Sequence, residues 1–321
     1  MKSRISRKST AVKALCSLAA ASLLGSAALL PGSAHASVWS LSGAIGTHDP
    51  TITKEGSTWW IFETSTSGIA VKYSGDGHAW TQGVPIFGGG LSWWKSYNGN
   101  SNSTWAADIH NWNGKAICYY AVSTFGSKNS AIGLTTATSI ATGNWTDQGV
   151  VLASNSGTAY NAIDPNFVVD TSNQPWLAFG SWSGGIYIVK LNASTLKPTG
   201  STTRIAADSS GIENAFIVHN GSYYYLFVSK GTCCNGASST YHICYGRSTS
   251  ITGPYVDKNG TSMVNGGGTT LDAGGGRFIA PGGESIYGTS VIARHELDSQ
   301  NNYASILFIN DLLWSNGWPT Y

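Results

Sequence analysis

Five acidic residues recur beside short apolar segments along the chain. They are Asp49, Asp108, Asp164, Glu213 and Glu284, and successive members lie 59, 56, 49 and 71 residues apart. Paired carboxyl groups hydrolyse glycosidic bonds, one protonating the departing oxygen and the other attacking or activating a water. Carboxylates gathered in one place repel each other unless they are hydrogen-bonded, metal-bound or used in a reaction. The recurrence predicts one shared acidic site. The alternative for any single member is a turn-capping acid.

Asp49 and Glu213 are the pair that we expect to carry the reaction. They belong to the first and fourth of five units, which a ring places across its centre. Inverting glycosidases hold their two carboxyl groups about 6.5–9.5 Å apart, against about 5–5.5 Å in retaining ones. The wide gap predicts inversion, with Asp49 as general base and Glu213 as general acid. Repulsion from Asp164, on the neighbouring unit, would raise the pKa of that acid.

Short strands must position these carboxyl groups. Segments such as 58–63, 115–122, 186–191 and 222–229 alternate in polarity and are rich in β-branched or aromatic residues. Turn pairs such as Asn113-Gly114 separate them. Units of about four strands that recur at this spacing are typical of propeller blades. We therefore predict an all-β, five-bladed β-propeller whose innermost strands bring all five acidic residues to the central channel.

The aromatic content fits a sugar-binding cleft. The chain holds 13 Trp, and sugar rings stack on aromatic faces. The candidates are Trp59, Trp60, Trp93, Trp94, Trp105 and Trp182. The alternative for each of them is packing between blades, which is least expected for the Trp93-Trp94 pair in the Gly- and Ser-rich loop 88–104.

The composition excludes several classes of protein. Charged residues make up only 11% of the chain, against roughly 25% in ordinary globular proteins. The high aromatic content argues against disorder, and the 40 Gly argue against helical bundles. After residue 36 there is no apolar run of about 20 residues, so we expect no membrane association of the mature chain.

The first 36 residues have the pattern of a signal peptide. Five basic residues precede an apolar stretch, and Ala34-His35-Ala36 is a suitable cleavage site. Removal of this leader leaves residues 37–321, with 13 basic and 16 acidic residues. We therefore predict a secreted, extracellular protein with a single catalytic domain. Without a basic patch we expect no nucleic-acid partner.

Cysteines and histidines leave two questions open. Cys118, Cys233, Cys234 and Cys244 allow three disulfide pairings in an exported protein, and the bond between adjacent Cys233 and Cys234 would be the unusual one. Three histidines fall at or near the predicted channel, which keeps a central cation open. They are His48, His110 and His295.

Several motifs together resemble glycoside hydrolase family 43, and within it the secreted endo-1,5-α-L-arabinanases. The resemblance runs from about Thr47 to Pro319. The matching motifs are His48-Asp49-Pro50, Trp105-Ala106-Ala107-Asp108-Ile109, Asn129-Ser130-Ala131-Ile132-Gly133, Tyr160-Asn161-Ala162-Ile163-Asp164-Pro165-Asn166, Gly211-Ile212-Glu213, segment 227–234, Tyr245-Gly246-Arg247-Ser248 and segment 313–319.

The resemblance implies the same fold and the same inverting reaction. It implies Asp49 as base, Glu213 as acid and Asp164 as the residue that adjusts the pKa of the acid. It also implies a set of substrate contacts: Asp49, Gly133, Asn161, Ala162, Ile163, Asp164, Ser181, Trp182 and Ser183. The implied substrate is arabinan, as in pectin side chains, and we expect a monomer.

Two positions depart from the family pattern. Many relatives carry Pro-Gly-His in the fifth unit, facing a central calcium site, whereas this chain has Pro281-Gly282-Gly283-Glu284. His295 remains as the residue implied for a central Ca²⁺, and we expect no required cofactor. Relatives often have Trp where this chain has Ser183. The stacking contact would then be either lost or moved to Trp182.

Two other functions are compatible with the same residues. One is an exo-acting arabinanase or arabinofuranosidase of the same fold, which a loop blocking one end of the groove would favour. The other is a non-catalytic sugar-binding propeller. Asp49, Asp164 and Glu213 argue against it, because binding alone needs no proton donor opposite a base.

Overall fold

The computed structural model describes residues 36–321. The predicted signal peptide, except its last residue, lies outside the described residues. Within the described part, no helix is long and apolar enough to cross a membrane.

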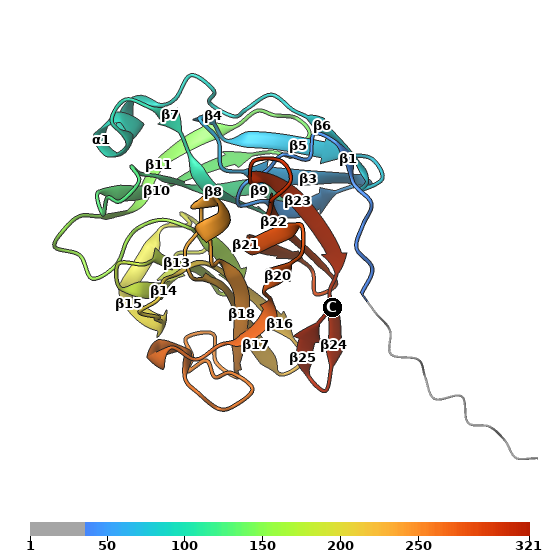
Figure 1. Cartoon of the computed structure of the whole chain (residues 1–321). Helices are drawn as coiled ribbons and strands as arrows, with labels where there is room; N and C mark the ends of the chain where they lie inside the picture. The colour runs from blue at the N-terminus through green and yellow to red at the C-terminus, as the bar shows by residue number, and fades with distance from the viewer. Residues whose placement is uncertain (1–35) are drawn as a thin grey trace, which may run out of the picture. The chain divides into compact units, whose positions relative to one another are not determined.

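The described chain forms five successive antiparallel sheets, which follow one another around a ring in chain order (Figure 1). This confirms the predicted all-β, five-bladed propeller. The first sheet also takes in a short parallel strand, β1. In strand order the blades are β1(Ser42–Gly43)-β6(Ala79–Gln82)-β5(Ala70–Ser74)-β3(Thr58–Glu63)-β2(Thr51–Glu55); β11(Thr146–Ser154)-β10(Ser130–Ala137)-β9(Lys115–Val122)-β8(Trp105–Trp112); β12(Asn166–Val169)-β13(Pro175–Ser181)-β14(Gly185–Leu191)-β15(Pro198–Ala206); β16(Ile212–Asn220)-β17(Tyr223–Lys230)-β18(His242–Ser248)-β19(Thr269–Asp272); and β20(Gly274–Gly275)-β21(Phe278–Tyr287)-β22(Val291–Asp298)-β23(Ala304–Asp311).

Shorter elements lie outside the blades. The loop before β8 carries a 3-10 turn at Ser92–Trp94 and the single helix turn α1, Lys95–Asn98. Two further 3-10 turns span Gly236–Ser238 and Met263–Asn265. The remaining strands form two small pairs: β4(Ser67–Gly68) with β7(Asn102–Ser103), and β24(Leu313–Ser315) with β25(Trp318–Thr320).

Apolar side chains of neighbouring blades pack into wedges between the sheets. Between the second and third blades, for example, Tyr119 and Leu134 meet Phe167 and Phe179. Most of the predicted sugar-stacking tryptophans belong to this packing or are partly covered by it. Trp94 is fully buried, whereas Trp182 is 48% exposed. Of these aromatic residues, Trp182 is the one best placed to reach a ligand.

The ring is closed by residues 37–47, which pair with the last blade. The Trp39 amide donates to the Ile309 carbonyl, and the Leu307 amide donates to the Ile45 carbonyl, both on the edge of β23. The same segment adds β1 to the outer edge of the first blade. The sequence analysis did not anticipate this closure, which joins the first blade to the fifth.

Each innermost strand contains a residue in the left-handed backbone region or follows one by two residues. The φ angles are 48° at Asp49, 42° at Ala106, 52° at Asp164, 51° at Asn214 and 62° at Gly283. Aligning the blades on these residues puts only Asp49 and Asp164 at the same position. Glu213 stands one residue earlier, Glu284 one later and Asp108 two later. The sequence analysis assumed that the five acids occupy one repeated position, and this assumption was wrong.

Residues two positions after the left-handed residue tie neighbouring blades together. Asp108 accepts a hydrogen bond from the Phe167 amide, and Asn166 Oδ1 accepts one from the Ile217 amide at 2.9 Å. Ser285 Oγ likewise accepts from the Ile52 amide at 3.0 Å. Asp108 therefore serves the joint between the second and third blades.

Candidate active site

Three of the predicted acidic residues meet at the centre of the propeller. Asp49, Asp164 and Glu213 come from the first, third and fourth blades, and repulsion from the other two raises the pKa of Asp164. Thr64 Oγ1 donates to Asp49 Oδ2 at 2.7 Å, and the Asn214 amide donates to Asp164 Oδ2 at 3.1 Å. The predicted base, modulator and acid thus share one electrostatic environment.

Glu213 has the properties of a general acid near neutral pH. Burial raises the pKa of its carboxyl to about 7, with a further contribution from the negative charge of Asp49. Tyr241 opposes this rise, because its hydroxyl donates to Glu213 Oε1 at 3.0 Å and stabilises the ionised form. The carboxyl therefore still holds a proton under mildly acidic conditions and can give it up.

Asp164 is also a buried carboxyl with a raised pKa. Burial is the main cause, and the charge of Glu213 is the next. Like charges this close make the two groups titrate as a pair, so the second proton is harder to remove than the first. At a pH where a single exposed carboxyl would be ionised, Asp164 and Glu213 therefore still hold at least one proton between them.

Three stacked rings connect the acid side of the site to the base side. Tyr241 lies parallel to His295 with ring centroids 6.0 Å apart, and His295 stacks on His48 at 4.2 Å. His295 Nδ1 accepts a hydrogen bond from the Asp49 amide at 3.2 Å. Because the rings come from the fourth, fifth and first blades, the stack fixes how those blades meet at the centre.

Gly283 lies against the base. A Cβ atom there would lie 2.7 Å from both Asp49 Oδ1 and His295 Nδ1, and its φ of 62° also favours glycine. This residue stands where the family pattern has the histidine of Pro-Gly-His. In this chain Asp49 and His295 approach the space that such a side chain would need.

Glu284 is a buried carboxyl next to this group. Burial raises its pKa to about 8, so it is mostly protonated at neutral pH. Ser229 Oγ donates to Glu284 Oε2 at 2.6 Å, and the Gly283 amide donates to Ser229 Oγ at 3.0 Å. Glu284 Oε1 has no hydrogen-bond partner within residues 36–321.

Asp108 and His110 lie apart from this site. His110 Nε2 is 2.9 Å from both carboxylate oxygens of Asp108, and His110 lines a separate cavity of about 310 Å³ with Lys54 and Phe216. His110 lies at the channel as expected, because this cavity is lined by residues of the innermost strands β2, β8, β16 and β21. The expectation of one ring of five acids was wrong for Asp108, which bonds to the Phe167 amide instead. The cause is the offset in the innermost strand, which directs Asp108 to the next blade.

The residues implied as substrate contacts fall into two groups. Gly133 lies beneath Trp93 and Tyr120, since a Cβ there would lie within 2.9 Å of both rings. Trp182 packs over Gly211, two residues before Glu213, and lines a cavity of about 420 Å³. Its neighbour Ser183 is partly exposed. The other members are largely buried: Asn161, Ala162, Ile163 and Ser181.

The buried members form the frame of the site. Ser154 Oγ accepts a hydrogen bond from the Ala162 amide at 2.9 Å and lies 3.3 Å from Asn161 Oδ1. The Ile163 carbonyl accepts from the Gly180 amide, which joins the segment before Asp164 to β13. These bonds hold the segment that leads into Asp164.

The candidate metal ligands are His48, Asp49 and His295, whose donor atoms lie within 4.8 Å of one another. His295 Nε2 is buried without a partner among the described residues. Ca²⁺ takes six to eight oxygen ligands, whereas this set supplies one carboxylate and two imidazoles. The protein donors on their own therefore do not fit calcium, and no step of the reaction below depends on a metal.

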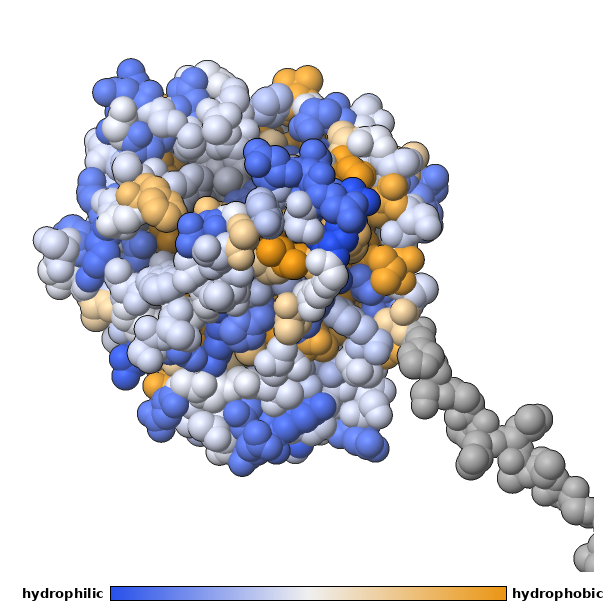
Figure 2. All heavy atoms as spheres, in the orientation of Figure 1, coloured by the Kyte–Doolittle hydropathy of each residue, from blue (hydrophilic) through white to orange (hydrophobic). Residues whose placement is uncertain are grey.

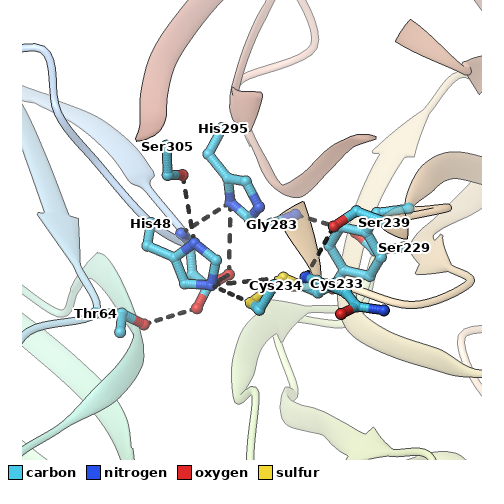
Figure 3. Close-up of a disulfide and its surroundings, with 12 residues drawn as sticks. His48, Thr64, Ser229, Cys233, Cys234, Ser239, Gly283, His295 and Ser305 are labelled. Atoms are coloured by element: carbon cyan, nitrogen blue, oxygen red, sulfur yellow. Dashed lines mark hydrogen bonds and ion pairs between the residues drawn. A yellow bond between two sulfur atoms is a disulfide. The ribbon is translucent and has the colours of Figure 1, made fainter. Parts of the chain in front are cut away.

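The structure also decides the cysteine pairing. Cys233 and Cys234 form a disulfide with each other, and Cys118 and Cys244 are buried thiols. Both sulfur atoms of the disulfide approach His48, at 3.8 and 3.5 Å from Nε2 (Figure 3). Sequence reasoning also missed Tyr241 and Thr64 as partners of the acid and the base, because neither stands near its partner in the chain.

Residues 44–319 match the sequence profile of glycosyl hydrolases family 43. The chain belongs to this family. It is 46% identical to the extracellular endo-α-(1→5)-L-arabinanase 1 of Bacillus subtilis over 90% of this chain and 91% of that one. It is 37% identical to the extracellular exo-α-(1→5)-L-arabinofuranosidase ArbA of Cellvibrio japonicus, covering 86% of each.

Solved structures of family 43 agree in fold over nearly the same length. A GH43 endo-arabinanase from Bacillus licheniformis superimposes with a TM-score of 0.86 and 48% identity, covering 88% of this chain and all of that one. A Cellvibrio cellulosa α-L-arabinanase complexed with arabinohexaose gives a TM-score of 0.81 at 36% identity, covering 86% and 95%. The family resemblance inferred from the motifs is confirmed.

Proposed function

We propose that this family 43 glycosidase is an endo-arabinanase that cleaves internal α-1,5-L-arabinofuranosidic bonds of arabinan with inversion. The observation that carries the proposal is the buried Glu213 carboxyl, whose pKa is raised to about 7 by burial and further by the nearby charge of Asp49. Its 46% identity to an extracellular endo-arabinanase supports the choice of substrate.

In the proposed reaction, Glu213 donates its proton to the oxygen that leaves the anomeric carbon. Asp49 accepts a proton from a water molecule, and that water attacks the anomeric carbon from the opposite face. The configuration at this carbon is therefore inverted. Each carboxyl ends the step in the opposite protonation state, and exchange with solvent resets both.

Asp164 acts on the acid rather than on the sugar. The charge of Glu213 raises the pKa of Asp164. Because repulsion between two like charges is mutual, an ionised Asp164 would in turn help Glu213 keep its proton until the substrate is bound. Its Oδ2 accepts from the amide of Asn214, the residue after Glu213, and so fixes the backbone that carries the acid.

We further propose secretion, a monomeric state and activity without a required cofactor. Two similar relatives are extracellular, and the signal peptide pattern at residues 1–36 agrees with export. The face in Figure 2 is mostly hydrophilic, with scattered hydrophobic spots. The exposed large apolar residues are Val38, Tyr73, Val84, Phe125 and Trp182. A scattered distribution suits a monomer better than a broad apolar interface would.

The direct test is hydrolysis of linear arabinan followed by proton NMR of the first product formed. We expect the β anomer to appear before mutarotation, and early products of mixed length. Glu213→Gln should lower the rate about 10²- to 10⁴-fold while retaining oligosaccharide binding. Single-sugar or uniform short products from the start would instead support the exo-acting alternative. Binding without any hydrolysis by the wild type would identify a sugar-binding propeller.

A further inference from the structure

The Cys233–Cys234 disulfide lies in the loop between β17 and β18, beside the predicted base. Cys233 packs against the small cluster around Tyr241 and Leu297, whereas Cys234 is exposed. The sulfur atoms lie 3.8 and 3.5 Å from His48 Nε2, and the same nitrogen lies 3.7 Å from Asp49 Oδ1 (Figure 3). The exposed side of the disulfide therefore belongs to the surface around Asp49.

The loop that carries the disulfide is held in a defined conformation. Thr232 and Thr240 close its base through two hydrogen bonds, at 3.0 and 2.9 Å. The Asn235 amide donates to Ser239 Oγ at 2.9 Å. Cys234 itself has a φ of 63°, which a residue other than glycine adopts only when its surroundings require it.

A disulfide differs chemically from the groups that surround it here. It carries no charge and no hydrogen-bond donor, and sulfur is a weak acceptor. Its neighbour His48 is ionisable, and His48 in turn lies 3.7 Å from the carboxylate of Asp49. A sugar ring presents C–H faces between its hydroxyl groups, and such a face packs better on an uncharged, polarisable surface than on a carboxylate.

We propose that the Cys233–Cys234 disulfide is a substrate-contacting surface of the active site, receiving an apolar C–H face of the sugar bound next to Asp49. This inference rests on the proposed function and adds a binding contact to it. The disulfide is not needed to hold the base, because His48 also stacks on His295 and lies 3.4 Å from Ser305 Oγ. Its loss should therefore weaken binding more than it slows the chemical step.

Opening the disulfide would also expose donors that are now masked. Two thiols and His48 would lie within 4.8 Å of one another, a set that soft divalent metals bind. Dithiothreitol supplies the two electrons and two protons that convert the S–S bond into two thiols, and it becomes a cyclic disulfide itself. Assays after reduction therefore need a chelator, so that adventitious metal does not imitate the loss of the contact.

The test measures KM and kcat on linear arabinan for the wild type, for the double variant C233S/C234S and for Ala237→Ser, an exposed position of the same loop. We expect the double variant to raise KM about tenfold and to change kcat less than twofold, with Ala237→Ser equal to wild type. Wild type reduced with dithiothreitol and a chelator should shift in the same way and recover on reoxidation. The double variant should not respond.

The outcomes separate this inference from the proposed function. An inactive wild type would refute the proposed function. An active wild type whose KM is unchanged both by reduction and in the double variant would overturn the substrate contact, as would equal losses in kcat and kcat/KM. Alkylation before and after reduction, read by mass spectrometry, checks that two thiols appear. If the double variant fails to fold, reduction of the folded wild type still decides the question.

Discussion

Tyr241 donates its hydroxyl hydrogen to Glu213 Oε1 at 3.0 Å, and its ring lies parallel to that of His295, which in turn accepts from the Asp49 amide. Tyr241 thus contacts the predicted acid directly and stacks on the histidine that binds the backbone of the predicted base. Substitutions at Tyr241 and at three other residues of the site test the contribution of each one separately.

Tyr241→Phe should move the alkaline limb of the pH profile to higher pH. The hydroxyl stabilises ionised Glu213, so its removal raises the pKa of the acid above about 7. Since the reaction needs protonated Glu213, activity would persist about one to two pH units further, given a charged hydrogen bond of about 1.5–3 kcal/mol. The measurement is kcat/KM from pH 4 to about 9. Tyr73→Phe, at an exposed position of β5, is the control.

Asp164→Asn should move the same limb in the opposite direction. The charge of Glu213 raises the pKa of Asp164. Since repulsion between like charges is mutual, the proposed modulator role requires that removing the Asp164 charge lowers the pKa of Glu213. Asn keeps an oxygen for the Asn214 amide, so the backbone contact survives. We expect a rate loss of about 10- to 100-fold at neutral pH and less in acid. A limb that stays in place would contradict the modulator role.

Glu284→Gln should flatten the dependence of stability on pH. The folded-state pKa of Glu284, about 8, is above its ordinary value of about 4.5, so the folded state binds the proton more tightly. Wild-type stability from this group is complete below about pH 4.5 and is lost as pH rises through about 8. We expect the variant to avoid a loss on the order of 5 kcal/mol over that window. Denaturant unfolding at pH 5 and pH 9 measures it, and parallel wild-type and variant curves would refute the assignment.

Gly283→Ala should impair the base more than a glycine substitution elsewhere. The new Cβ would press on Asp49 Oδ1 and His295 Nδ1 at 2.7 Å, so we expect at least a hundredfold loss in kcat, in line with misplacement of a reacting group. Gly288→Ala is a matched control, because its φ of 61° is nearly the same and nothing lies within 4 Å of its Cβ. Equal activity losses in both variants would assign the effect to backbone strain alone.

Local patterns along the chain are enough to predict the blades and to single out the acidic residues. Alternating polarity over segments such as 115–122 and turn pairs such as Asn113-Gly114 are local signals, and each reports one strand or one turn without knowledge of the rest. Recurrence of an acid in every unit then indicated a ring with a shared centre. The family motifs pointed to the same three residues, Asp49, Asp164 and Glu213.

Which acids reach that centre, and what surrounds them, depends on the folded ring. Relative to the position shared by Asp49 and Asp164, Glu213 stands one residue earlier and Asp108 two residues later, so Asp108 joins two blades while Glu213 enters the site. Tyr241 and the Cys233–Cys234 disulfide lie far from Asp49 in sequence and carry no motif that links them to it. Such contacts depend on how blades close around the ring, and that closure is a property of the whole chain rather than of any one segment.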